Sequence, residues 1–426
     1  MTRAVAIVDG EHYPPVVRDA LAELPHDVVA AVLVGGTEKL RGEVDYGVPL
    51  APSLEAAIHE HAPDVVLDLS DEPVLGPVER MALASRSLAL GVPYEGADFR
   101  FDPPAFAPFG LPSIAVIGTG KRVGKTAVTG HLARLLARDL SVVVVAMGRG
   151  GPGEPEVIEG APTLDDLLAR SRAGLHAASD HLEIAAVTGV TTIGCRRAGG
   201  GLAGAVAVSN VADGAAAAVR LQPDLVVFDG SGAALPPVDV GARVLVVSAQ
   251  QDPLVATGYL NDYRHRIADL VVLTSAAEAS ARERLRAAAQ VLVREGVRVV
   301  ATVLEPRPLA PVAGRRVAYF GTAPAETHDA TVETLRERHG ADVVAVSGSL
   351  ADRSRLREEL ARIEVDTYLV ELKAAAIDVV VEDARARGID VVLVANDVVP
   401  LPGEDDLDAE LLQLAAGATS AVAEPV

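Results

Sequence analysis

The sequence predicts an α/β fold with a doubly wound, mostly parallel sheet and smaller α/β domains on either side. Half of the residues are hydrophobic and there is no Trp. Val, Ala and Leu dominate, which suits buried parallel strands covered by Ala-rich helices. Short apolar runs also alternate with amphipathic helical patterns along the chain. At 426 residues the chain is long enough for three domains.

The first domain is expected over residues 1–105 as a small Rossmann-like unit. Apolar runs predict strands at residues 4–10, 27–36 and 64–70, with helices at residues 16–24 and 53–62 between them. A segment rich in Pro and Phe, residues 99–113, is typical of a linker.

The central domain is expected over residues 106–312. Strands are predicted near residues 113–120, 141–151, 190–197, 225–232, 242–250, 269–275 and 297–308. Helical patterns at residues 127–139, 163–175 and 279–296 separate many of them. This alternation predicts the doubly wound sheet.

A third α/β domain is expected over residues 313–417. Its strands are predicted near residues 314–324, 342–350, 367–376 and 390–397. The last residues, 418–426, are expected to form a flexible tail.

The charge pattern excludes several classes of partner. The formal charge is −21, and no block of Lys or Arg offsets it, so neither nucleic acid nor an anionic membrane is an expected partner. A lone cysteine, Cys195, excludes an intramolecular disulfide and a multi-cysteine metal site. The apolar runs are too short to span a bilayer and no signal segment is seen, so we expect a cytoplasmic protein.

The most informative stretch runs from Gly118 to Ala127, between a predicted strand and an amphipathic helix. Its residues are Gly118, Thr119, Gly120, Lys121, Arg122, Val123, Gly124, Lys125, Thr126 and Ala127. Backbone N–H groups of such a loop can surround the phosphates of a nucleotide, Lys125 can bridge the β- and γ-phosphates, and the Thr126 hydroxyl can reach Mg²⁺. In the usual pattern the first glycine lies five residues before the glycine of the Gly-Lys-Thr motif; here Thr119 holds that place and Gly118 lies one residue earlier. A plain glycine turn is the alternative, but the strand–loop–helix context favours a sheet of the phosphate-loop nucleoside triphosphatase type.

Lysine is rare in this chain, which makes Lys121 notable. Only Lys39, Lys121, Lys125 and Lys373 occur, and two of them fall in the loop. A compact ammonium group at Lys121 could touch the transferred phosphoryl group, or it could simply be solvated. Lys373, just past an apolar strand, is suggestive in the same way.

A carboxylate for the metal is expected at Asp229, at the end of the strand near residues 225–232. It would bind Mg²⁺ or orient a water ligand, unless it only caps the strand. The glycine-rich loop at residues 148–154 offers Arg149 as a cation facing the substrate and Glu154 as a second carboxylate for the metal. A solvated surface loop is the competing interpretation.

Arg196 and Arg197 follow a strand and precede three glycines. Two guanidinium groups beside unhindered amides predict a site for a second anion, such as a phosphorylated acid; an exposed pair at a turn is the alternative. The later strands lack the Asp-containing segment typical of guanine recognition, so ATP is the expected nucleotide. His12, near Asp9, Glu11 and Tyr13 at a strand end, could contact a phosphate or shuttle a proton, or be solvated.

Together these motifs resemble a known family. The loop spacing is similar to that of dethiobiotin synthetases. The segments IVDGEHYPPVV, GTGKRVGKTAV, GCRRAGGGLAG, LVVFDGSGAALPPV and VELKAAAIDV, spread over most of the chain, resemble cyclic 2,3-diphosphoglycerate synthetases. The resemblance implies ATP-dependent closure of 2,3-diphosphoglycerate to its cyclic form, with Mg²⁺, release of ADP and phosphate, and His12, Arg149, Arg196 and Arg197 as substrate contacts.

The mechanism expected from these residues places Lys121, Lys125 and Asp229 at the reacting phosphates, and we expect a homodimer. Three alternatives remain at this level: a related synthetase for a different phosphorylated acid, a ligase or kinase of the dethiobiotin synthetase type, and a nucleotide-switched binding protein.

Overall fold

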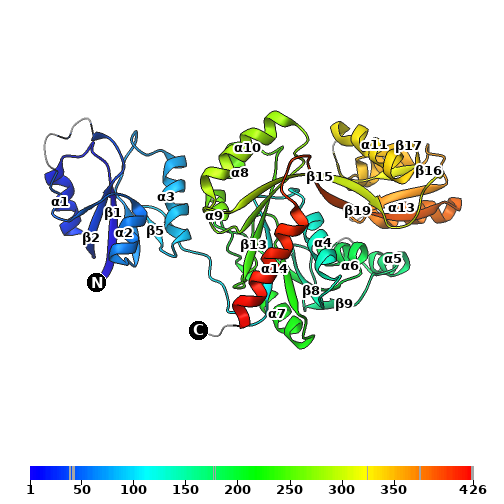
Figure 1. The fold of residues 1–426 in the computed structure, drawn as a ribbon, viewed down its shortest axis with the longest axis horizontal. Helices are drawn as coiled ribbons and strands as arrows, with labels where there is room; N and C mark the ends of the chain where they lie inside the picture. Colours follow the sequence, from blue (N-terminus) through cyan, green and yellow to red (C-terminus); the bar gives the residue numbers. More distant parts are fainter. Residues whose placement is uncertain are drawn as a thin grey trace.

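The computed structural model consists of three α/β units arranged along its longest axis (Figure 1). It describes residues 1–37, 40, 44–175, 177, 179–323, 325–373 and 376–423. Lys39 and the last three residues lie outside the described residues.

The N-terminal unit has a six-stranded sheet in the order β3-β2-β1-β4-β5-β6, parallel except for β6. The strand β1 is buried on both faces from Ala4 onward, as expected for a parallel strand covered by helices. In the sheet, β2 lies on one side of β1 and β4 lies on the other, so the strand order reverses at β1. A ligand-binding crevice is expected at such a reversal, at the carboxyl ends of β1 and β4. The elements are β1 (Thr2–Val8), α1 (Pro14–Glu23), β2 (His26–Leu33), β3 (Leu50–Ala51), α2 (Leu54–His61), β4 (Val65–Asp68), α3 (Pro77–Ala89), β5 (Tyr94–Glu95) and β6 (Arg100–Phe101).

The central unit contains the expected doubly wound sheet. Its strands run in the order β11-β10-β8-β12-β7-β13-β14-β15, all parallel except for the short β11 and for β9, which pairs with β10. The elements are β7 (Ser113–Gly118), α4 (Lys125–Leu136), β8 (Val142–Gly148), β9 (Glu156–Ile158), α5 (Leu164–Arg172), α6 (Asp180–Thr188), β10 (Thr191–Ala198), β11 (Val208–Ser209), α7 (Val211–Arg220), β12 (Leu225–Asp229), β13 (Ala242–Ser248), α8 (Pro253–Thr257), α9 (Asn261–Arg266), β14 (Leu270–Thr274), α10 (Ala279–Leu292) and β15 (Arg298–Pro308).

The C-terminal unit is not a separate sheet. Its strands, in the order β19-β18-β16-β17, join the central sheet because β15 and β19 pair antiparallel from Thr302 to Pro308, giving one sheet of 13 strands. The elements are β16 (Arg316–Phe320), η2 (Ala325–Thr327), α11 (His328–His339), β17 (Asp342–Ser347), η3 (Ser349–Ala351), α12 (Arg353–Leu360), β18 (Thr367–Glu371), α13 (Ile377–Arg387), β19 (Asp390–Pro400) and α14 (Leu407–Ala423).

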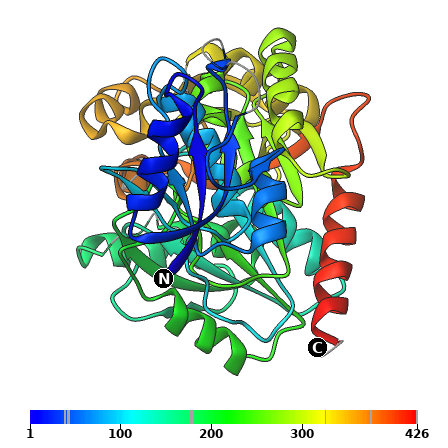
Figure 2. The ribbon, with the colours of Figure 1, turned by 90° about the vertical axis from the view of Figure 1, so that its left-hand side faces the viewer.

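The last helix differs from the sequence expectation. α14 continues to Ala423, so the expected flexible tail is helical over residues 418–423. Leu407, Leu411, Ala415 and Ala418 recur at helical spacing and are buried against the central unit, where α14 contacts β7, β13 and α4 (Figures 1 and 2). The helix therefore packs with the central unit, although residues 407–417 were expected to belong to the C-terminal unit.

Side-chain packing also holds the units together. Leu167 and Leu182, from α5 and α6, share a core with Phe320 and Tyr368 of the C-terminal unit. On the other side α3 packs on α9, and the Ser85 hydroxyl donates a hydrogen bond to the Tyr259 carbonyl at 3.1 Å. No helix in the described part of the chain is long and apolar enough to cross a membrane.

Candidate active site

The glycine-rich loop joins β7 to α4, as its sequence predicts. Gly124, with φ of +93°, caps α4, and Arg122 also has positive φ at +62°. A Cβ atom at Gly118 would lie 2.9 Å from Cδ of Lys125, so a side chain there would displace the lysine. The loop is tied to the strands beside it: the Thr274 hydroxyl donates to the Val123 carbonyl at 2.7 Å.

Lys125 begins α4 and is folded back over the loop. Its Nζ donates to the carbonyl of Gly120 at 2.8 Å, and the residue is only 9% exposed. Burial lowers the pKa of Lys125 to about 8, although the carboxylates of Asp229 and Asp180 act in the opposite direction. A phosphate anion would replace the lost solvation, so this buried ammonium group is suited to binding one. Lys121 and Arg122, by contrast, are exposed at the tip of the loop.

Asp229 ends β12, which lies directly beside β7. Its Oδ1 accepts a hydrogen bond from the Thr129 hydroxyl at 2.7 Å. Thr126 lies one turn earlier on the same face of α4. Burial, together with the neighbouring charge of Asp180, raises the pKa of Asp229 to about 7, and the Thr129 hydrogen bond and Lys125 limit the rise.

Arg149 and Arg197 come together near the same loop. A Cβ atom built on Gly232 would lie 3.4 Å from Nη2 of Arg197 and 3.5 Å from Nη2 of Arg149. Burial, followed by the charge of Arg149, lowers the pKa of Arg197, and both arginines also lower that of Lys125. Within the described residues neither arginine forms an ion pair, and Nε of Arg197 is buried without a hydrogen-bond partner. Three cations thus lie close enough to influence one another, and Asp180 and Asp229 are the carboxylates nearby, although none of the three cations forms an ion pair among the described residues.

The adjacent Arg196 does not join this group. Successive side chains of a strand point to opposite faces, and Nη1 of Arg196 would lie 3.4 Å from a Cβ atom on Gly153. The backbone N–H of Arg196 donates to Asn210 Oδ1 at 2.7 Å. The arginine pair that the structure assembles is therefore Arg149 with Arg197, and not Arg196 with Arg197. Glu154 is exposed in the loop before β9.

Three carboxylates near this site were not identified from the sequence. Asp180 and Glu183 come from α6, and Glu371 ends β18 of the C-terminal unit. Nζ of Lys373 lies 3.5 Å from Oε1 of Glu371 and 3.9 Å from Oε1 of Glu183, so this lysine bridges the two units. Burial raises the pKa of Glu183 to about 8, against the attraction of Lys373. The acidic first turn of α6 was the available sequence signal, but it is equally typical of any helix start.

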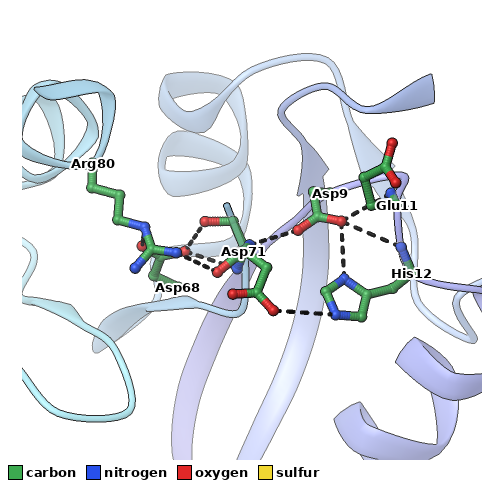
Figure 3. Close-up of polar contacts among 7 residues, drawn as sticks. Asp9, Glu11, His12, Asp68, Asp71 and Arg80 are labelled. Atoms are coloured by element: carbon green, nitrogen blue, oxygen red, sulfur yellow. Dashed lines mark hydrogen bonds and ion pairs between the residues drawn. The ribbon is translucent and has the colours of Figure 1, made fainter. Parts of the chain in front are cut away.

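His12 lies in the N-terminal unit, near the carboxyl ends of β1 and β4 (Figure 3). Its Nδ1 is 2.9 Å from Oδ1 of the buried Asp9, and its Nε2 is 3.9 Å from Oδ2 of Asp71. Asp9 also accepts the backbone N–H of Asp71 at 2.7 Å. Burial raises the pKa of Asp9, but these hydrogen bonds outweigh it and leave the pKa below its ordinary value.

The other charged pair near these strand ends is Asp68 with Arg80. Nε of Arg80 lies 3.5 Å from Oδ2 of Asp68, and its Nη2 donates to the Ser70 carbonyl at 2.6 Å. Among the described residues, the partners of His12 all belong to the N-terminal unit.

Comparison with known proteins identifies the family. Residues 3–102, 113–303 and 308–397 match the N-terminal, P-loop and C-terminal domain models of cyclic 2,3-diphosphoglycerate synthetase. The chain is 48% identical to the protein of that name from Rubrobacter xylanophilus over 98% of both chains, and 43% identical to the one from Thermococcus kodakarensis over 94% of this chain and 96% of that protein. The chain belongs to this family.

Membership makes the protein an enzyme of the ATP-dependent ligase type with an ATP-binding P-loop domain. Among solved structures, LpxK from Aquifex aeolicus in complex with ATP is 15% identical, covers 73% of this chain and 90% of that chain, and superposes with a TM-score of 0.43. A similarity at this level carries no inference about function.

Proposed function

We propose that the protein catalyses ATP-dependent cyclisation of 2,3-diphosphoglycerate, forming cyclic 2,3-diphosphoglycerate, ADP and phosphate. The observation that carries the proposal is the convergence of Arg149 and Arg197 beside Lys125. Three neighbouring cations that form no ion pair among the described residues fit a substrate with several negative charges, whereas a mostly apolar acid would leave them without a counter-charge in direct contact. The names of the relatives supply the identity of that substrate.

The first step transfers the γ-phosphoryl group of ATP to an oxygen of one substrate phosphate. A new P–O–P bond forms, the bond to the β-phosphate breaks, and ADP leaves. Lys125 and the loop amides would stabilise charge on the transferred group, and Lys121 could approach it from the exposed tip of the loop.

The second step closes the ring. An oxygen of the other substrate phosphate attacks the activated phosphorus and displaces the former γ-phosphoryl group as inorganic phosphate. Because both phosphates belong to one molecule, correct alignment replaces a bimolecular encounter. Arg149 and Arg197 would hold the two anionic groups close together, with His12 as a further proposed contact; Arg196, beside Gly153, is assigned no contact.

Thr126 and Asp229 fit the oxygen-donor set that Mg²⁺ prefers. In the described residues, no group of three or more His, Cys, Asp and Glu side chains could hold a metal alone. A cation bound here would therefore depend on nucleotide phosphates for its other ligands, as Mg²⁺ commonly does. Mg²⁺ would neutralise charge on the β- and γ-phosphates. Glu154 as a further metal ligand, and a homodimeric assembly, remain proposals.

Incubation of the protein with Mg-ATP and 2,3-diphosphoglycerate, followed by phosphorus NMR, tests the proposal. We expect a cyclic pyrophosphate together with equal amounts of ADP and inorganic phosphate. ADP release only with a different acid would assign the protein to another ligase or kinase reaction. Negligible turnover with every phosphorylated acid, relieved by a protein partner, would instead indicate a nucleotide-switched binding protein.

A further inference from the structure

Arg264 of α9 is a buried charge without a counter-ion. It is 1% exposed, and no ion pair connects it to any carboxylate of the described chain. Burial lowers its pKa to about 10. Burying an unpaired charge is costly, and an apolar side chain of similar volume would fill the same space without that cost. The guanidinium group therefore requires an explanation beyond packing.

Its partners are backbone carbonyls of two loops that border the candidate active site, and the carbonyl of Leu260, which caps its own helix. Nε and Nη2 both donate to the Ala233 carbonyl, the former at 2.9 Å, and Nη1 donates to Leu202 at 3.1 Å and to Leu260 at 2.8 Å. Leu202 belongs to the glycine loop, residues 199–204, and Ala233 belongs to the β12 turn, residues 231–234. A planar group with several fixed donors is suited to holding two such segments in register.

Arg197 bridges the same two segments at a second point. Its Nη1 donates to the Gly199 carbonyl at 3.2 Å, and its Nη2 donates to the Ser231 carbonyl at 2.7 Å. Arg264 is enclosed, whereas Arg197 is partly exposed and close to Arg149 and Lys125. The buried guanidinium thus fixes the two loops on which the substrate-facing guanidinium rests.

Gly204 shows how closely these parts fit. The N–H of Leu235 donates to the Gly204 carbonyl at 2.8 Å, which adds a direct link between the two loops. A Cβ atom on Gly204 would lie 3.0 Å from Nη2 of Arg264 and 2.7 Å from Cγ of Leu235. Its φ of +95° is also unfavourable for other residues.

We propose that Arg264 is a positioning residue, which holds the glycine loop and the β12 turn so that Arg197 faces Arg149 and Lys125 before the phosphorylated acid binds. The proposal rests on the role assigned to Arg197 under the proposed function. Arg264 itself touches no substrate, and its effect on binding must pass through Arg197.

A double-mutant cycle between Arg264→Met and Arg197→Ala tests this coupling, with KM for 2,3-diphosphoglycerate measured at saturating Mg-ATP. We expect Arg264→Met to raise KM about 10-fold, with a smaller change in kcat and unchanged affinity for ATP. In the Arg197→Ala background it should add almost nothing. Arg264→Lys keeps the charge but cannot reach the same carbonyls, so we expect a similar rise in KM. The Lys variant replaces Arg264→Met in the cycle if Arg264→Met does not fold.

Leu285→Ala is the control for lost stability, because Leu285 is buried in the same unit but belongs to α10 and to neither loop. It should lower Tm without raising KM. Equal rises in KM from Arg264→Met in the wild-type and Arg197→Ala backgrounds, or no rise in either, would overturn the positioning role. If Arg197→Ala itself left KM unchanged, the proposed substrate site would fail instead.

Discussion

The N-terminal and central units share a reversal of strand order in a parallel sheet, but they differ in whether the cations beside it are paired with carboxylates. In each, the strand order reverses at one point of the sheet, and open α/β sheets bind ligands at the carboxyl ends of the strands there. This place is called the crevice of the unit. The central crevice gathers Lys125, Arg149 and Arg197 without an ion pair among the described residues. In the N-terminal crevice, His12 and Arg80 are engaged by Asp9, Asp71 and Asp68 (Figure 3). Topology therefore indicates where a ligand can lie, and the pairing of charges indicates which crevice suits an anion.

The largest effect is expected from Lys125→Ala in the central crevice. Removing the ammonium group over the phosphate-binding loop should reduce ATP turnover by about 10³-fold or more, because its charge stabilises the transferred phosphoryl group. ADP release measures the loss, and thermal melting verifies folding. The exposed Lys121→Ala is the matched variant, for which we expect a smaller loss, about 10-fold. Retention of a tenth of the activity by Lys125→Ala would contradict this assignment.

A second contrast compares two neighbouring arginines within the central crevice. Arg197→Ala should raise KM for 2,3-diphosphoglycerate by about 10–100-fold, the range expected when a charged hydrogen bond is lost. Arg196→Ala should change KM less than about 3-fold, because its side chain lies beside Gly153 on the other face of the sheet. Calorimetry should show ATP affinity unchanged in both. Equal effects of the two substitutions would show that the strand alternation does not separate their roles.

His12→Asn tests the N-terminal crevice. If His12 contacts the substrate, KM for 2,3-diphosphoglycerate should rise by about 2–10-fold, the value of a single ordinary hydrogen bond, while ATP affinity stays the same. Asp71→Asn, which removes a neighbouring charge but keeps the shape, is the control. An effect as large as that of Arg197→Ala would mean that both crevices bind the acid equally. No effect would remove His12 from the site.

The smallest effect concerns stability at the junction of the central and C-terminal units. Burial raises the pKa of Glu183 to about 8, above its ordinary value of 4.5. The folded state therefore holds this proton more tightly than the unfolded state, and the resulting stability is present below pH 4.5 and is lost as the pH rises through 8. Glu183→Gln cannot ionise, so its Tm relative to the wild type should increase between pH 5.5 and pH 8.5.

A difference of about 1 kcal/mol corresponds to roughly 2–4 °C in Tm. Melting curves at the two pH values measure it. Glu295→Gln, an exposed carboxylate in the loop before β15, should show no such dependence on pH. A relative Tm of Glu183→Gln that falls with rising pH would show that its carboxylate is stabilising when ionised.

Much of the fold was predictable because its signals are local. The apolar runs of β7, β8, β12, β13 and β14 and the strand–loop–helix pattern around Lys125 need only neighbouring residues to be recognised. The prediction of a doubly wound sheet was confirmed. The pairing of β15 with β19 was not foreseen, because it joins segments separated by more than 80 residues. The hydrophobic pattern of neither segment indicates which strand is its partner. The packing of α14 on the central unit has the same cause.

For the candidate site, sequence alone determined the phosphate-binding loop, the position of Asp229 at a strand end beside it, and the presence of several arginines at the ends of neighbouring strands. Tertiary structure decided which arginines meet. In the folded chain Arg149 lies beside Arg197, and Arg196 lies on the other face of the sheet. Four residues that the sequence did not indicate also lie near the site: Asp180, Glu183, Glu371 and the buried Arg264. The physical reason is that a loop motif consists of consecutive residues, which the sequence shows directly. The balance of charges at a binding site depends on side chains from distant segments, and only the folded chain defines the distances between them and their burial.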